Sequence, residues 1–311
     1  MTIVRALASS TSAVLGLLLC HAAASAQDGT SAQTQKINAY VECINRLSER
    51  SYDSRARYFS WVGKNGPTGK ERIIYGTYTI YDTADCKAGV EKANALEPRD
   101  AELEAAASAY VEAVTTLEPL LKETDDYYEQ ENYKDDKMAK GKALHPRLVA
   151  AWDAFASADQ KLRDGLDVIQ DKRAVEELAE IEKTEGQKDR YHVQSLMMRA
   201  KRLMSAQKTA KPDLKKITEA LGEYEAIANA TEAYAQANKD SKIGSSFVGS
   251  AKSLLVTGKQ LMRRIRDKVP YSQGDKMMLD AGSGWMIEGS PDRLLRDYNE
   301  LIESYNRGAN F

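Results

Sequence analysis

Apolar residues recur every three or four positions over most of this chain, which predicts long amphipathic helices. The first stripe starts at Thr34 and continues to about Val62, where a Gly- and Pro-containing turn at 63–67 stops it. Similar stripes predict further helices at about 83–96, 100–128, 146–203, 212–231, 245–268 and 291–305. We therefore expect an all-α fold, an elongated bundle of long antiparallel amphipathic helices in a single domain, 27–311.

Two segments lack the helical pattern. Residues 73–81 are β-branched and aromatic, which predicts a short strand or a packed extended loop. Residues 271–289 are irregular yet partly apolar, so they should pack against the bundle.

The first and last helices each carry two asparagines seven residues apart, Asn38 with Asn45 and Asn299 with Asn306. Residues at this spacing share a helix face, so we expect these helices to pair antiparallel, asparagine beside asparagine. Coincidence in heptad-like sequence is the alternative. The pairing would bring both irregular segments to one end of the bundle.

That bundle end is the candidate ligand-binding surface. It would gather five aromatic residues: Trp61, Tyr75, Tyr78, Tyr81 and Trp285. Loops carried by a rigid scaffold commonly bear function. The alternative is that the aromatic rings only plug the end of the bundle.

The N-terminus has the pattern of a secretory signal peptide. Arg5 precedes a short apolar run that ends in Ala24-Ser25-Ala26, a cleavage motif of the A-x-A type. We expect cleavage after Ala26 and a soluble periplasmic or secreted protein with no transmembrane helix in the mature chain. Leu19 stands before Cys20 where a lipid-attachment signal needs a small residue, so we expect no lipid anchor there.

Cleavage would leave two cysteines, Cys43 and Cys86. An even count in an oxidising compartment favours a disulfide, and two buried thiols are the alternative. The pair is not a C-x-x-C motif, so its expected role is structural.

The net charge and its distribution limit the classes of molecule that this chain is expected to bind. The formal net charge is −2, without the basic excess of nucleic-acid-binding proteins. Residues 242–276 carry eight bases against two acids, including Arg263-Arg264-Ile265-Arg266. A solvated helix face is the favoured interpretation of this run, and a patch for anionic lipid or polysaccharide is the alternative.

No catalytic motif stands out. The mature chain has two histidines, no H-E-x-x-H and no G-x-S-x-G, so no metal site or cofactor is expected. One polar cluster, Asp135, Asp136 and His145, could bind a hard cation or share a proton. The favoured interpretation is a solvated helix end, with the acids at a helix start and the histidine capping a turn.

The chain resembles the YiiG-like family of exported bacterial proteins, often lipoproteins, whose domain has no known function. The resemblance rests on three stretches: Ile37-Asn38-Ala39-Tyr40 with Ile44-Asn45; Tyr127-Tyr128, Tyr133-Lys134-Asp135-Asp136 and Lys140-Gly141-Lys142-Ala143-Leu144-His145; and Gly284-Trp285 and Gly289-Ser290 leading into Tyr298-Asn299 and Asn306. It implies export and a helical fold, and no activity.

Three functions follow as hypotheses. The leading one is a non-enzymatic periplasmic protein that binds an envelope protein or a small ligand. A cell-envelope hydrolase with a carboxylate-based site and a structural envelope protein are the alternatives.

Overall fold

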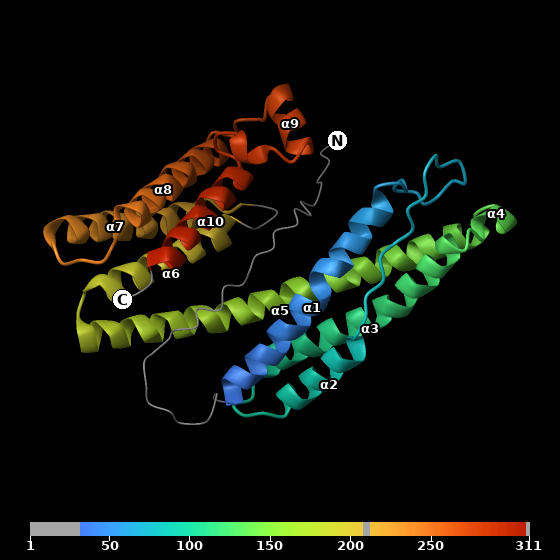
Figure 1. The fold of residues 1–311 in the computed structure, drawn as a ribbon, viewed down its shortest axis with the longest axis horizontal. Helices are drawn as coiled ribbons and strands as arrows, with labels where there is room; N and C mark the ends of the chain where they lie inside the picture. The colour runs from blue at the N-terminus through green and yellow to red at the C-terminus, as the bar shows by residue number, and fades with distance from the viewer. Residues whose placement is uncertain (1–31, 208–211, 309–311) are drawn as a thin grey trace. The chain divides into compact units, whose positions relative to one another are not determined.

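A computed structural model describes residues 32–207 and 212–308, and within these ranges the regular structure is helical (Figure 1). The predicted signal peptide lies outside the described residues. The helices are α1 (Ala32–Phe59), α2 (Thr83–Asn94), α3 (Ala101–Glu129), α4 (Tyr133–Asp136), α5 (Ala139–Glu185), α6 (Asp189–Gln207), α7 (Leu214–Ala237), α8 (Ser245–Arg266), α9 (Gln273–Asp280), the 3-10 turn η1 (Gly284–Met286) and α10 (Pro291–Gly308).

The chain divides into two compact units, Met1–Ile169 and Gln170–Phe311. The boundary falls inside the continuous helix α5, which is why no change of composition marks it in the sequence. Each unit has a hydrophobic core of its own.

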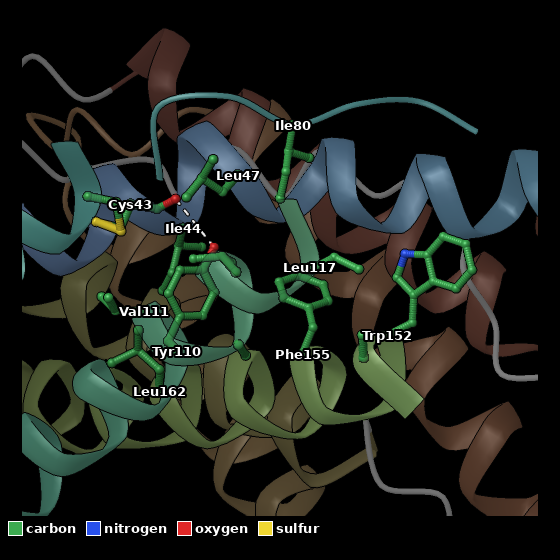
Figure 2. Packing of buried hydrophobic residues seen from close by; sticks show 14 of the residues in the cluster. Cys43, Ile44, Leu47, Ile80, Tyr110, Val111, Leu117, Trp152, Phe155 and Leu162 are labelled. Atoms are coloured by element: carbon green, nitrogen blue, oxygen red, sulfur yellow. Dashed lines mark hydrogen bonds between the residues drawn. A yellow bond between two sulfur atoms is a disulfide. The ribbon is translucent and has the colours of Figure 1, made fainter. Parts of the chain in front are cut away.

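The core of unit 1 lies between α1, α2, α3 and the first part of α5. Its largest buried side chains include Tyr40, Tyr58, Tyr110, Trp152 and Phe155. Figure 2 shows Tyr110 and Phe155 facing α1, with Ile80 of the segment between α1 and α2 pointing into the same core. The Cys43–Cys86 disulfide joins α1 to α2 across a Cα–Cα distance of 5.2 Å, as predicted.

A buried carboxylate links three side chains inside unit 1. Asp159 on α5 is 3% exposed. It accepts hydrogen bonds from Ser48 Oγ (2.7 Å) and Tyr52 Oη (3.0 Å) on α1, and from Arg163 Nε (2.9 Å). Because a buried charge needs such partners, this network fixes how α1 and α5 pack.

Unit 2 packs α6, α7, α8 and α10 around a second core. Gly258 of α8 allows a close approach: a Cβ there would lie 3.1 Å from Leu221 and 3.4 Å from Leu203. The main partners of α10 are α8 and η1, followed by α6, whereas α1 packs on α2. The four asparagines of the terminal helices are all exposed. The predicted antiparallel pairing of the terminal helices, asparagine beside asparagine, stays a prediction, because α1 and α10 belong to different units.

The predicted elements differ from the observed ones at Ala139, at Gly186 and within 271–289, and at 73–81 one of the two predicted alternatives is correct. Helix α5 begins at Ala139, ahead of Pro146, and the long stripe breaks at Gly186, whose φ is +79°. Residues 73–81 form no strand, and the extended loop is the correct alternative. The stretch 271–289, predicted as irregular, contains α9 and η1, because Ser272 and Asp275 form a capping box.

Candidate functional site

The five aromatic residues predicted for the bundle end divide between the units. Trp61, Tyr75, Tyr78 and Tyr81 belong to unit 1, and Trp285 belongs to η1 of unit 2. Trp285 is 42% exposed, with the Arg296 guanidinium 5.7 Å from its ring centroid. We describe the site in unit 1 first.

One face of α1 holds the extended segment 75–79 by side-chain hydrogen bonds. Three donors on α1 and one in the turn after it, spaced by three or four residues, each reach a backbone carbonyl: Arg50 to Thr79 (3.3 Å), Ser54 to Tyr78 (2.6 Å), Arg57 to Tyr75 (2.8 Å) and, after the helix, Trp61 to Gly76 (3.1 Å). Residues at this spacing lie on one side of a helix. The helix side chains thus take the place of a neighbouring strand, which explains an extended backbone without a sheet.

A shallow groove opens beside this seam. Its lining is Asp53, Ala56 and Arg57 from α1, Ser60 from the turn that follows α1, and Tyr75 and Tyr78 from the segment. The Arg57 guanidinium lies 4.5 Å from the Tyr78 ring centroid and 5.6 Å from that of Tyr75. Such cation–π contacts and its hydrogen bonds to the Tyr75 carbonyl and the Tyr78 hydroxyl fix the guanidinium at the groove wall.

The charge of the groove is only partly compensated. No carboxylate of the described ranges comes within 4.0 Å of Arg57 or Arg50 to form a salt bridge. Burial and the neighbouring Glu129 and Asp126 raise the pKa of Asp125, and both arginines oppose that rise. The groove therefore combines a fixed cation, two aromatic rings and the polar groups of Asp53 and Ser60.

The other predicted aromatic residues have different surroundings. Tyr81 is 66% exposed and is not part of the groove lining. Trp61 packs edge-on against Tyr128 at 4.9 Å and against Tyr58 at 5.5 Å. Trp61 is therefore partly buried against the core of unit 1.

The structure does not bring Asp135, Asp136 and His145 together. Asp136 accepts from the backbone N–H groups of Ala139 (3.2 Å) and Lys140 (2.8 Å), so it caps the start of α5. The Lys140 amide, with the Tyr127 hydroxyl, lowers the pKa of Asp136. The Asp135 side chain is exposed.

His145 lies inside α5 and is buried, so it caps no turn. Its Nε2 is 3.2 Å from the Lys64 carbonyl oxygen and its Nδ1 is 3.1 Å from the Tyr58 hydroxyl. Since a carbonyl only accepts, Nε2 carries the proton and Nδ1 accepts from Tyr58. In the described part of the chain, no three His, Cys, Asp or Glu residues are grouped to hold a metal ion. No helix there is both long and apolar enough to cross a membrane.

Sequence reasoning missed the α1 side of the groove. The signal was the stripe Arg50, Ser54, Arg57 and Trp61, which mixes polar donors with one tryptophan at helical spacing. A stripe that mixes polar residues with one tryptophan lacks the apolar pattern that predicts a buried helix face. Its role follows only from the extended segment that lies along it.

Comparisons with known proteins identify the family to which this chain belongs. No solved structure matches the chain. It is 39% identical over 279 residues, 88% of this chain and 78% of the other, to the "Uncharacterized protein YiiG" of Escherichia coli (strain K12). The model of the family described as "Protein of unknown function (DUF3829)" matches residues 31–307, and the chain belongs to this family.

Proposed function

We propose that this chain is an exported, non-enzymatic binding protein, and that its ligand site is the groove between α1 and residues 75–78. Export is supported by the N-terminal leader pattern and by the Cys43–Cys86 disulfide, which suits an oxidising compartment. The observation that carries the site is the Arg57 guanidinium fixed against Tyr75 and Tyr78 at an open groove.

The chemistry of the lining favours a small sugar-like ligand. The CH face of a sugar ring packs on a flat aromatic side chain, while its hydroxyls need donors and acceptors at the edge. Tyr75 and Tyr78 supply the rings, and Arg57, Asp53 and Ser60 supply the polar partners. A soluble fragment of a cell-envelope glycan is the ligand class that we infer for an exported protein.

A thermal-shift screen of purified 27–311 against saccharides and peptidoglycan fragments tests the proposal. A ligand that binds only the folded state stabilises it by about 2.7 kcal/mol at a hundredfold excess over Kd, which raises Tm. Tyr75→Ala should abolish the shift, because it removes one ring of the groove. Tyr81→Ala is the matched control, since it removes an exposed tyrosine of the same segment outside the groove.

Two results would contradict the proposal. Equal loss of the shift in both variants would show that the ligand does not use the groove. Cleavage of the bound fragment, seen as a product by mass spectrometry, would favour the hydrolase alternative over a binding protein.

A further inference from the structure

Helix α9 buries none of its residues. Its capping box makes the helix locally stable, with the Ser272 hydroxyl accepting from the Asp275 amide at 3.1 Å. Its apolar residues are consecutive, Met277-Met278-Leu279, and Met277 is 68% exposed. Helix α9 follows the C-terminal end of α8 (Figure 1). A helix of this kind at the periphery of a unit needs a partner for its apolar side.

Further exposed apolar side chains surround α9. Met286 is 51% exposed, Val269 49% and Trp285 42%. η1, which carries Trp285 and Met286, contacts α9, and a Cβ on Gly284 would lie 2.9 Å from Leu279. These four residues, Val269, Met277, Trp285 and Met286, are named the apolar tip.

Arg264 fixes the geometry of the apolar tip. Its guanidinium donates to the Pro270 carbonyl (3.3 Å) and to the Glu288 carbonyl (2.9 Å), and it lies 4.5 Å from the Tyr271 ring centroid. The segment that carries Val269 and the segment after Met286 are therefore held together by one side chain.

Basic residues flank the segments that carry the apolar tip in the sequence. Arg263, Lys268 and Lys276 are exposed, and none of them forms a salt bridge with a carboxylate of the described ranges. Of the nearby acids, Asp267 pairs with Arg266 and Asp275 caps α9, whereas the side chains of Asp280 and Glu288 are exposed. Exposed apolar groups bordered by free cations match the interface of an anionic bilayer, where Trp and Met enter the acyl boundary and Lys and Arg contact headgroups.

We propose that the apolar tip docks unit 2 on the surface of a membrane that contains anionic lipid. The docking is peripheral, with Met277, Trp285 and Met286 inserted at headgroup depth and Lys268 and Lys276 on lipid phosphates. The surface is formed by unit 2 alone and is independent of the groove in unit 1.

Co-sedimentation of 27–311 with vesicles tests the docking. The protein should bind phosphatidylglycerol–phosphatidylethanolamine vesicles and bind pure phosphatidylcholine vesicles much more weakly. Met277→Ser combined with Met286→Ser should lower the affinity roughly tenfold or more, because two apolar side chains no longer leave water. Lys268→Glu combined with Lys276→Glu should abolish the preference for anionic lipid.

Val256→Ser is the matched control, because Val256 is 54% exposed on α8 and is not part of the apolar tip. It should bind vesicles like the unchanged protein. All these positions are exposed, so circular dichroism should show an intact fold. The proposal is overturned if the unchanged protein does not bind anionic vesicles, if the methionine variant binds like the control, or if the control loses binding equally. Absence of vesicle binding would leave a protein as the partner of this surface.

Discussion

Ser54 and Tyr78 exchange two hydrogen bonds. The Ser54 hydroxyl donates to the Tyr78 carbonyl at 2.6 Å and accepts from the Tyr78 backbone N–H at 3.1 Å. A serine on a helix thus satisfies both backbone groups of an extended residue, as a neighbouring strand would. This pairing fixes the register between α1 and the segment that forms one wall of the groove.

Ser54→Ala should therefore destabilise unit 1 by about 1–3 kcal/mol, because it leaves a backbone donor and acceptor of Tyr78 without partners. Hydrogen exchange should rise locally at 75–79. Urea denaturation and exchange mass spectrometry measure the two effects. Ser51→Ala is the control: Ser51 is equally buried, but its hydroxyl bonds only the Leu47 carbonyl of its own helix. Equal exchange at 75–79 in both variants would contradict this role of Ser54.

Gly141 shows a conflict between helix preference and packing. A Cβ there would lie 2.6 Å from the Tyr128 hydroxyl and 2.8 Å from the Met138 sulfur. Alanine favours a helix over glycine by about 1 kcal/mol, but overpacking costs about 1–3 kcal/mol, so we expect a net loss of up to about 2 kcal/mol for Gly141→Ala.

The matched substitution Gly222→Ala should raise the free energy of unfolding, whereas Gly141→Ala should lower it. Gly222 lies inside α7, and a Cβ there meets no heavy atom within 4 Å. Only the helix preference then applies, and we expect a gain of up to about 1 kcal/mol. Thermal and urea denaturation of the two variants check both signs. A stabilised Gly141→Ala protein would show that Tyr128 and Met138 move aside at little cost.

Most helices could be predicted from the sequence because their buried residues recur every three or four positions, which is the period of an α-helix. The apolar stripe of α1, with Tyr40, Leu47 and Tyr58, became the core of unit 1, and Asp100 and Asp213 cap α3 and α7 through their side chains. The division into units was not predictable from composition, because α5 crosses it without a break.

The groove was only half predictable. Tyr75 and Tyr78 could be predicted as candidates because they are aromatic residues in a non-helical segment. Arg57 and Ser54 could not, because they have the pattern of ordinary polar positions on α1. Their role depends on which segment lies along that face, and this is a tertiary contact that no local pattern contains. The same holds for His145, whose partner Tyr58 is 87 residues away.

The Cys43–Cys86 bridge should stabilise unit 1. It closes a loop of 43 residues, which in the chain-entropy model is worth about 4 kcal/mol. Replacing both cysteines by alanine should lower the free energy of unfolding of unit 1 by this amount, measured by urea denaturation, and hydrogen exchange should rise in α1 and α2. Exchange in α7 and α8 should not change, since these helices belong to the other core. A uniform increase throughout the chain would contradict this assignment.

His192 should make the stability of unit 2 depend on pH. The ring is buried and stacks on Tyr234 at 4.4 Å, and burial lowers its pKa below the usual 6.5, opposed by the nearby Asp189. Below pH 6.5 the unfolded chain therefore binds a proton that the folded chain refuses. Stability should fall as the pH drops from 6.5 towards the folded pKa, by at most about 1.4 kcal/mol per pH unit.

His192→Phe isolates this contribution, because phenylalanine keeps a ring against Tyr234 and cannot take up a proton. Urea denaturation at about pH 7.5 and about pH 5.5 should show a larger loss of stability on acidification for the unchanged protein than for the variant. The carboxylates contribute to both proteins alike, so the difference between the two slopes belongs to His192. Identical slopes would mean that the folded protein accepts the proton on His192 without cost, and burial against Tyr234 would then not be what sets its pKa.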